Sequence, residues 1–190
     1  MKRRSGINMS DVKMSNRGLI LRQIKNNPKP RKDIAEKIKL TPAAVTILVN
    51  ELIEQGCIRE SGQVNEPSRV GRKKVFIELI KNYKYAVGIN IEGSHMNICV
   101  GNLQAEILDS VNIRISKLTP EQVLESAVKR VRELIKGLNI KQEQLLGVGV
   151  GIVGNVDTKN GISRHAYGLW DREVEVESYL TKALELPVVV

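Results

Sequence analysis

The sequence predicts an α/β chain of two domains, a small basic domain of helices followed by a mixed sheet that carries helices. The first observation is length, because 190 residues, 42% of them hydrophobic, suffice for one or two packed cores. The second is charge: residues 1–84 carry 19 Lys and Arg against 8 Asp and Glu, whereas residues 85–190 carry 11 against 13. The third is a change from helical to strand-like periodicity across the polar junction at residues 81–84. A net charge of +11 in the first part favours a nucleic-acid-binding module joined to a domain of another kind.

Composition excludes several classes of protein. The hydrophobic fraction is too high for a disordered chain, and no apolar run approaches the roughly 20 residues of a membrane span. The basic start is not followed by an apolar signal core. Cys57 and Cys99 are far apart and belong to no CxxC pair, which argues against a disulfide framework or a cysteine-rich zinc site. We therefore expect a cytoplasmic protein with no membrane partner.

Residues 1–14 are predicted to form a basic tail, and residues 15–80 a domain that opens with two short helices. Apolar side chains recur at helical spacing over residues 16–26, and Pro28 prevents that helix from continuing. A second amphipathic helix is expected over residues 33–39.

A third helix is predicted to begin at Thr41-Pro42, where threonine can cap free backbone amides and proline suits the first helical position. Its apolar stripe is core: Val45, Leu48, Val49, Leu52 and Ile53. Its opposite face is small or uncharged: Ala43, Ala44, Thr46, Ile47 and Asn50. A helix that enters the major groove needs such a face, because its N-terminal residues meet base edges. Thr46 and Asn50 can hydrogen-bond bases, and Ile47 can contact a thymine methyl group.

Two strands, at residues 57–60 and 75–79, are predicted to flank a long loop over residues 61–74 that ends in a basic run. A basic hairpin beside a groove-binding helix can reach phosphates or the minor groove. The whole pattern is typical of a winged helix-turn-helix. The predicted DNA-binding residues are Arg31, Lys32, Thr41, Pro42, Ala43, Ala44, Thr46, Ile47, Asn50, Arg69, Arg72, Lys73 and Lys74. The alternative is a small helical bundle whose basic residues are simply solvated.

The pattern after the junction is typical of a mixed sheet with helices. The expected strands and helices follow one another along the chain: strands at residues 85–91, 96–103 and 107–115, a helix that begins at Thr119-Pro120, a strand at 145–152, a hairpin that turns near Asn160-Gly161, a helix at 174–184 and a strand at 186–190. Gln122 completes a capping box with Thr119.

Gly149, Gly151 and Gly154 formally match the GxGxxG fingerprint of dinucleotide-binding proteins. That fingerprint opens a helix, whereas here Asn155 and the residues after it lead into a hairpin. We expect these glycines instead to let a ligand or a neighbouring strand approach the backbone closely.

The third-helix and hairpin pattern resembles the ROK family, as do residues 88–94 (GINIEGS), 149–157 (GVGIVGNVD) and 186–190 (LPVVV). That family comprises sugar-responsive repressors and sugar kinases with an actin-like, ribonuclease-H-like ATPase fold. The resemblance implies an α/β multi-domain chain, with the winged helix-turn-helix followed by the first lobe of a ROK domain over residues 85–190. The N-terminal domain makes the chain similar to the xylose and N-acetylglucosamine repressors.

The resemblance implies a repressor rather than an enzyme. Kinases of the family carry an Asp-x-Gly-Gly-Thr phosphate loop, where this chain reads Asn90-Ile91-Glu92-Gly93-Ser94. Asn90 replaces the carboxylate that organises the metal and phosphates, and Glu92 adds a negative charge where phosphates would approach. The alternative is a ROK-type sugar kinase with an accessory DNA-binding domain.

The partners that the resemblance implies are an operator duplex on the nucleoid, a sugar effector and further copies of the chain, as a homodimer or a higher homo-oligomer. Gly154 and Asn155 are expected to form one wall of the sugar pocket. The family's Glu-Asn-Asp motif and its Cys/His zinc motif would lie beyond Val190, so we expect no cofactor or metal in this chain. A truncated fragment that binds DNA constitutively is a further alternative.

Overall fold

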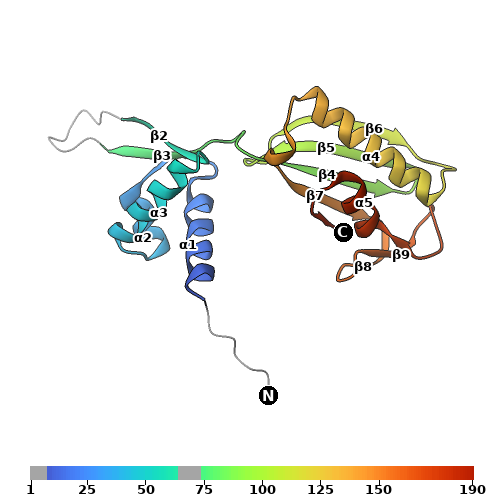
Figure 1. The fold of residues 1–190 in the computed structure, drawn as a ribbon, viewed down its shortest axis with the longest axis horizontal. Coiled ribbons are helices and arrows are strands. Elements are labelled where there is room, and N and C mark those ends of the chain that lie inside the picture. The colour runs from blue at the N-terminus through green and yellow to red at the C-terminus, as the bar shows by residue number, and fades with distance from the viewer. Residues whose placement is uncertain (1–7, 64–73) are drawn as a thin grey trace, which may run out of the picture. The chain divides into compact units, whose positions relative to one another are not determined.

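The computed structural model describes residues 8–63 and 74–190 and divides the chain into two compact units, Met1–Lys81 and Asn82–Val190 (Figure 1). The division falls inside the polar junction, and each unit has buried apolar residues of its own.

The described residues of the first unit form three helices, α1 (Met9–Ile24), α2 (Arg31–Ile38) and α3 (Pro42–Glu54), and a three-stranded antiparallel sheet. The strands are β1 (Lys29–Pro30), β2 (Ile58–Gln63) and β3 (Val75–Leu79), in the order β1-β3-β2. The apolar stripes of the helices and strands meet in one small core: Ile20, Ile24, Ile34, Ala35, Val45, Leu48, Val49, Leu52, Cys57, Ile58 and Ile77. Burial of these stripes is what stabilises such short helices.

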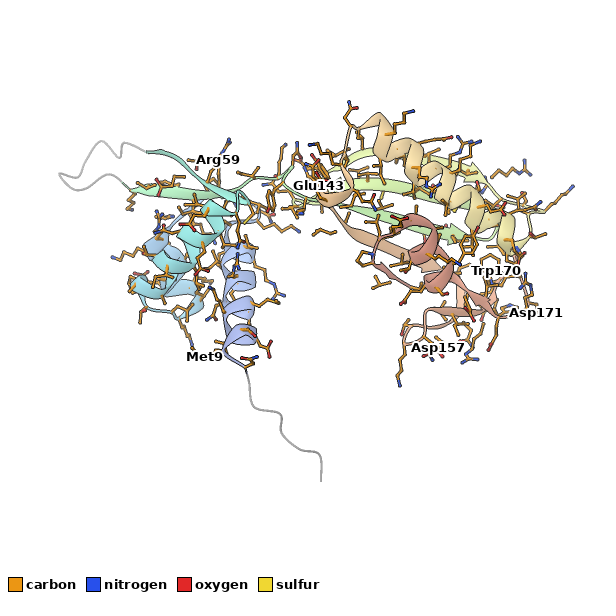
Figure 2. All side chains as sticks on the ribbon, viewed as in Figure 1. Met9, Arg59, Glu143, Asp157, Trp170 and Asp171 are labelled. Carbon is orange, nitrogen blue, oxygen red and sulfur yellow. The ribbon has the colours of Figure 1, made fainter. Side chains whose placement is uncertain are left out.

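The prediction of a basic tail over residues 1–14 was wrong for its second half, because α1 begins at Met9. Asn8 caps the helix by accepting a hydrogen bond from the Ser10 amide at 3.4 Å, and Asp11 lies in the first turn. Met9, labelled in Figure 2, and Met14 are exposed by 87% and 74%. This part of α1 therefore has no buried stripe, which is the signal that helix prediction depends on.

The segment directly after Pro28, for which no strand was predicted, contains strand β1. Lys29 pairs with Ile77 and Pro30 with Phe76, both in β3. Proline has no amide hydrogen to donate to a neighbouring strand. Pro30 lies on an edge strand, where this loss is tolerated.

The second unit is built on a five-stranded mixed sheet of order β11-β7-β4-β5-β6. A meander of β4 (Tyr85–Glu92), β5 (His95–Asn102) and β6 (Ile107–Arg114) is antiparallel, whereas β7 (Leu145–Ile152) pairs parallel to β4 and to β11 (Val188–Val189). The predicted last strand, residues 186–190, is therefore shorter than expected.

Two helices, α4 (Pro120–Gly137) and α5 (Val176–Leu184), cover one face of this sheet (Figure 1). The alternate residues of β4 and β5 that meet them are fully buried or nearly so: Val87, Ile89, Ile91, Met96, Ile98 and Val100. The predicted capping box is confirmed at the start of α4, where the Thr119 and Gln122 side chains each bond the other residue's backbone amide.

The predicted hairpin after β7 is present. It consists of β8 (Gly154–Asp157) and β9 (Ile162–Ala166), and β10 (Val174–Glu175) adds to β9 in a second antiparallel sheet. A short 3-10 helix, Gln142–Gln144, leads into β7. Trp170, labelled in Figure 2, is buried in the core of this unit and donates its indole N–H to Ser163 Oγ at 3.1 Å.

Candidate nucleic-acid interface

Helix α3 has one face in the core and one face in solvent. Val45 and Val49 are 0% exposed, whereas Ile47, which lies between them in sequence, is 62% exposed. Thr46 and Asn50 are exposed on the same side as Ile47. Ile47 therefore lies with Thr46 and Asn50 on the solvent-facing side of α3, the side on which the sequence predicts contacts to bases.

The start of α3 is held by its cap. Thr41 Oγ1 accepts a hydrogen bond from the Ala44 amide at 3.2 Å, and Pro42 occupies the first turn as predicted. Thr41, Pro42 and Ala43 are exposed, and Ala44 is half-buried. Small side chains at this end allow a partner to approach the backbone of the first turn.

Charge distinguishes the N-terminus of α3 from those of the other α-helices in the described part of the chain. Each of the others has an acidic residue in its first turn, Asp11, Asp33, Glu121 or Glu177, whereas α3 has none. The N-terminus of a helix carries about half a positive charge. In α3 this charge is not neutralised by the helix's own carboxylates, which suits an anionic partner.

Thr46 uses its hydroxyl hydrogen inside the helix. Its Oγ1 donates to the Pro42 carbonyl oxygen at 2.8 Å, one turn earlier. The hydroxyl oxygen keeps lone pairs with which it can accept a hydrogen bond from a base amino group.

Arg31 connects α2, α3 and β2 on this side of the unit. Its Nη2 donates to Asn50 Oδ1 at 3.2 Å and to Glu60 Oε1 at 2.8 Å. Its Nε is buried and has no hydrogen-bond partner among the described residues. Two of the predicted contacts, Arg31 and Asn50, are thus brought together, and Glu60, which the sequence prediction did not include, joins them.

The other predicted basic contacts are distributed differently. Lys32 is exposed on α2 and forms a loose ion pair with Glu36 at 3.9 Å. Lys74 is exposed directly before β3. Arg69, Arg72 and Lys73 lie outside the described residues.

The residues predicted to line a sugar pocket lie on β8 of the second unit. Gly154 has φ +147°, and a Cβ there would lie 2.0 Å from the His165 carbonyl oxygen, so only glycine fits beside β9. Asn155 is exposed on the same strand. The sequence predicts that a ligand or a neighbouring strand lies close to the backbone of these glycines. At Gly154 the close neighbour is strand β9.

Asp157, at the end of β8 and labelled in Figure 2, is held by two polar neighbours. It accepts hydrogen bonds from Asn160 Nδ2 and from Arg164 Nη2, each at 3.0 Å. These bonds, from Asn160 first and Arg164 second, lower the pKa of the Asp157 carboxyl. His165 is hydrogen-bonded as well, with its Nδ1 2.7 Å from Asp171.

The end of β4 carries a carboxylate, Glu92. Asn90 Nδ2 donates to Glu92 Oε1, and both side chains are exposed next to Gly93. Within the described residues, no three His, Cys, Asp or Glu side chains come together in a group that could hold a metal ion. Nor does any helix in residues 8–63 and 74–190 have the length and apolar character needed to cross a membrane.

Comparison with known proteins identifies the second unit. The model of the ROK family matches residues 86–190, which is more than half of the chain. The chain belongs to the ROK family. Its second unit is therefore a ROK domain, built on the mixed sheet described above.

Named relatives and one solved structure are similar to both units together. The xylose repressor of Caldicellulosiruptor bescii is 26% identical over 180 residues, which cover 93% of this chain and 44% of that protein. The DNA-binding transcriptional dual regulator NagC of Escherichia coli is 26% identical over 94% of this chain and 43% of its own length. The crystal structure of a ROK family transcriptional regulator, a homologue of the E. coli MLC protein, superposes with a TM-score of 0.73. It is 22% identical and covers 94% of this chain and 45% of its own, which shows a shared fold. The chain thus spans less than half the length of these relatives.

Proposed function

We propose that the chain is a sequence-specific DNA-binding transcriptional regulator, a repressor of sugar-utilisation genes that a sugar effector releases from its operator. Its first unit would act as a winged helix-turn-helix, with α3 in the major groove and the hairpin of β2 and β3 as the wing. The observation that carries this proposal is the outward face of α3, where Thr46, Ile47 and Asn50 are exposed on a helix fixed by its buried stripe.

Two further features support DNA as the partner. The N-terminus of α3 lacks the acidic residue found in the first turn of the other described α-helices, and the excess positive charge lies in the first part of the chain. The named relatives, which match this chain across both units, are a xylose repressor and a DNA-binding regulator.

The end of β4 supports a regulator without kinase activity. Glu92 is exposed there and bonded to Asn90, so a carboxylate stands where the phosphates of a nucleotide would approach. Two like charges about 4 Å apart repel by roughly 4 kcal/mol at the effective dielectric constant of a protein surface. Turnover of ATP with a hexose by this chain would overturn this part of the proposal.

A sugar effector would bind the ROK domain near Gly154 and Asn155 and act by favouring a state with lower operator affinity. Such a response requires different sugar affinities in the two states. A palindromic operator would be bound by a homodimer or a larger homo-oligomer in the cytoplasm, since the symmetry of such a site mirrors that of the protein.

The direct experiment is a binding-site selection. The full chain, immobilised, is presented with a library of randomised DNA duplexes, and the enriched duplexes are then titrated by fluorescence anisotropy between 50 and 200 mM salt. These concentrations are chosen because phosphate contacts weaken by orders of magnitude over about that range. We expect enrichment of one sequence pattern and an affinity that falls with salt. Recovery of no common pattern would contradict the proposal.

The effector is tested on the same complex. Xylose and N-acetylglucosamine are added separately, with glycerol as a control polyol. We expect one sugar to weaken the complex by about 5- to 150-fold, the usual range of allosteric coupling. Binding that neither sugar changes would favour the alternative of a constitutive DNA-binding fragment.

A further inference from the structure

We infer that Arg31 acts as a positioning residue that turns the Asn50 amide into a hydrogen-bond donor toward DNA, so that α3 selects guanine over adenine at the base pair facing Asn50. The inference rests on the proposed function. It concerns three residues that lie far apart in the sequence and meet at the exposed face of the first unit.

The orientation of the Asn50 amide follows from the chemistry of its partner. Arg31 Nη2 lies 3.2 Å from Asn50 Oδ1. A guanidinium has only N–H donors, so the atom of Asn50 that faces it must be the carbonyl oxygen. The amide nitrogen, which carries two hydrogens, has no hydrogen-bond partner among residues 8–63 and 74–190, and Asn50 is exposed.

Glu60 holds Arg31 in this place. The same Nη2 donates to Glu60 Oε1 at 2.8 Å, so both hydrogens of that nitrogen are used, one for each partner. The Arg31 side chain is only 24% exposed, and its Nε is buried. Arg31 is therefore tied to its own unit, unlike the neighbouring Lys32, whose side chain is 81% exposed.

The consequence for base recognition is specific. An asparagine that reads adenine must donate to N7 and at the same time accept from the N6 amino group through Oδ1. Here a second donor would have to approach Oδ1 beside a positive guanidinium, which disfavours it. Guanine presents two acceptors, N7 and O6, on its major-groove edge, and these match the two hydrogens of the Asn50 amide.

The test uses the full chain and the randomised duplex library described above. Asn50→Ala identifies the base pair that Asn50 reads, as the position at which preference disappears. At that position the unsubstituted chain is expected to enrich guanine and to lose at least about fivefold in affinity when guanine is replaced by adenine. Arg31→Met frees the amide to rotate, so we expect guanine and adenine to bind within about twofold of each other there, with the other positions unchanged.

Lys32→Met is the matched control, because it removes one positive charge from the adjacent position on α2. We expect it to weaken all duplexes alike and to lower the salt dependence, as loss of a phosphate contact does. If Arg31→Met behaves in the same way and keeps the guanine preference, Arg31 touches phosphate and the inference is overturned. Adenine in the enriched duplexes at the position lost in Asn50→Ala, or no position lost in that variant, overturns it as well.

A second variant separates this effect from a loss of folding. Asn50→Asp keeps an oxygen for Arg31 but has no hydrogen to donate, so the guanine preference should disappear while the thermal unfolding temperature is unchanged. An Asn50→Asp protein that still prefers guanine contradicts the inference. Failure of the unsubstituted chain to enrich any sequence would instead overturn the proposed function itself.

Discussion

Helices α3 and α4 belong to different units and begin in the same way, yet their outward faces differ. Each is capped by a threonine and has a proline in its first turn, and each buries an apolar stripe. The outward face of α4 is charged, with Glu125, Lys129 and Arg130 among its residues. The outward face of α3 carries no charge between Pro42 and Asn50. This difference fits a solvent-facing role for α4 and supports the proposal that α3 faces a partner.

The largest expected effect is a loss of stability when the buried faces of α3 and α4, which are alike, are truncated. Leu52 of α3 and Leu124 of α4 are each 2% exposed. Truncation of either to alanine should cost about 2–5 kcal/mol of unfolding free energy, because a cavity is left in a packed core. Urea unfolding, followed separately for each unit by hydrogen exchange, measures the cost. A loss below about 1 kcal/mol in either variant would show that the stripe is not core.

Substitutions of exposed residues are expected to weaken DNA binding when they lie on α3 of the first unit, and to leave it unchanged when they lie on the second unit. Ile47→Glu places a carboxylate on the face proposed to meet DNA and should weaken binding to the enriched duplex by about 1–3 kcal/mol, the cost of a mismatched base pair, or more. The matched control is Ile107→Glu in β6, where the isoleucine is 66% exposed. It adds the same charge and should leave the anisotropy titration unchanged. Equal losses in the two variants would contradict the assignment of α3.

Removal of the caps compares the two helix starts directly. Thr41→Ala and Thr119→Ala should each lower the unfolding free energy by about 1 kcal/mol, since each leaves a helix amide without its partner. Only Thr41→Ala should also weaken DNA binding, because it loosens the end of α3 that is proposed to meet the bases. If Thr119→Ala weakens binding as much, the effect reports stability rather than contact.

The smallest effect concerns the acidic residue that α4 has and α3 lacks. The hydrogen bond from Arg172 is the main cause that lowers the pKa of Glu121 below its ordinary value. A lowered folded-state pKa means that Glu121 contributes stability above the pKa of the unfolded chain, and that this is lost as pH falls through the folded-state pKa. The Glu121→Gln protein should therefore lose less stability between pH 7 and pH 3 than the unsubstituted chain. The difference should be small, because the carboxyl is exposed, and an identical pH profile in thermal unfolding would contradict it.

Local signals in the sequence were sufficient to predict much of both units. Thr41-Pro42 and Thr119-Pro120 predicted two helix starts, and both are confirmed. The exposure of Ile47 followed from the helical spacing of its buried neighbours and is confirmed as well. Signals of this kind depend only on residues within one or two turns.

Features that depend on distant residues could not be predicted. Strand β1 is only two residues long, and it exists because β3 pairs with it from more than 40 positions away. The bonds of Arg31 to Asn50 and Glu60 span 19 and 29 positions and depend on how α2, α3 and β2 pack. Arg31 is among the residues predicted from the sequence to bind DNA, whereas its position in the fold favours a role in orienting Asn50.

The most direct measurement is hydrogen–deuterium exchange of the full chain with and without the enriched duplex. If α3 is the helix that contacts DNA, exchange should slow in peptides that cover Pro42–Glu54 and remain unchanged in those that cover Pro120–Gly137. Exchange that slows in α4 on addition of the duplex, and does not slow in α3, would contradict the account.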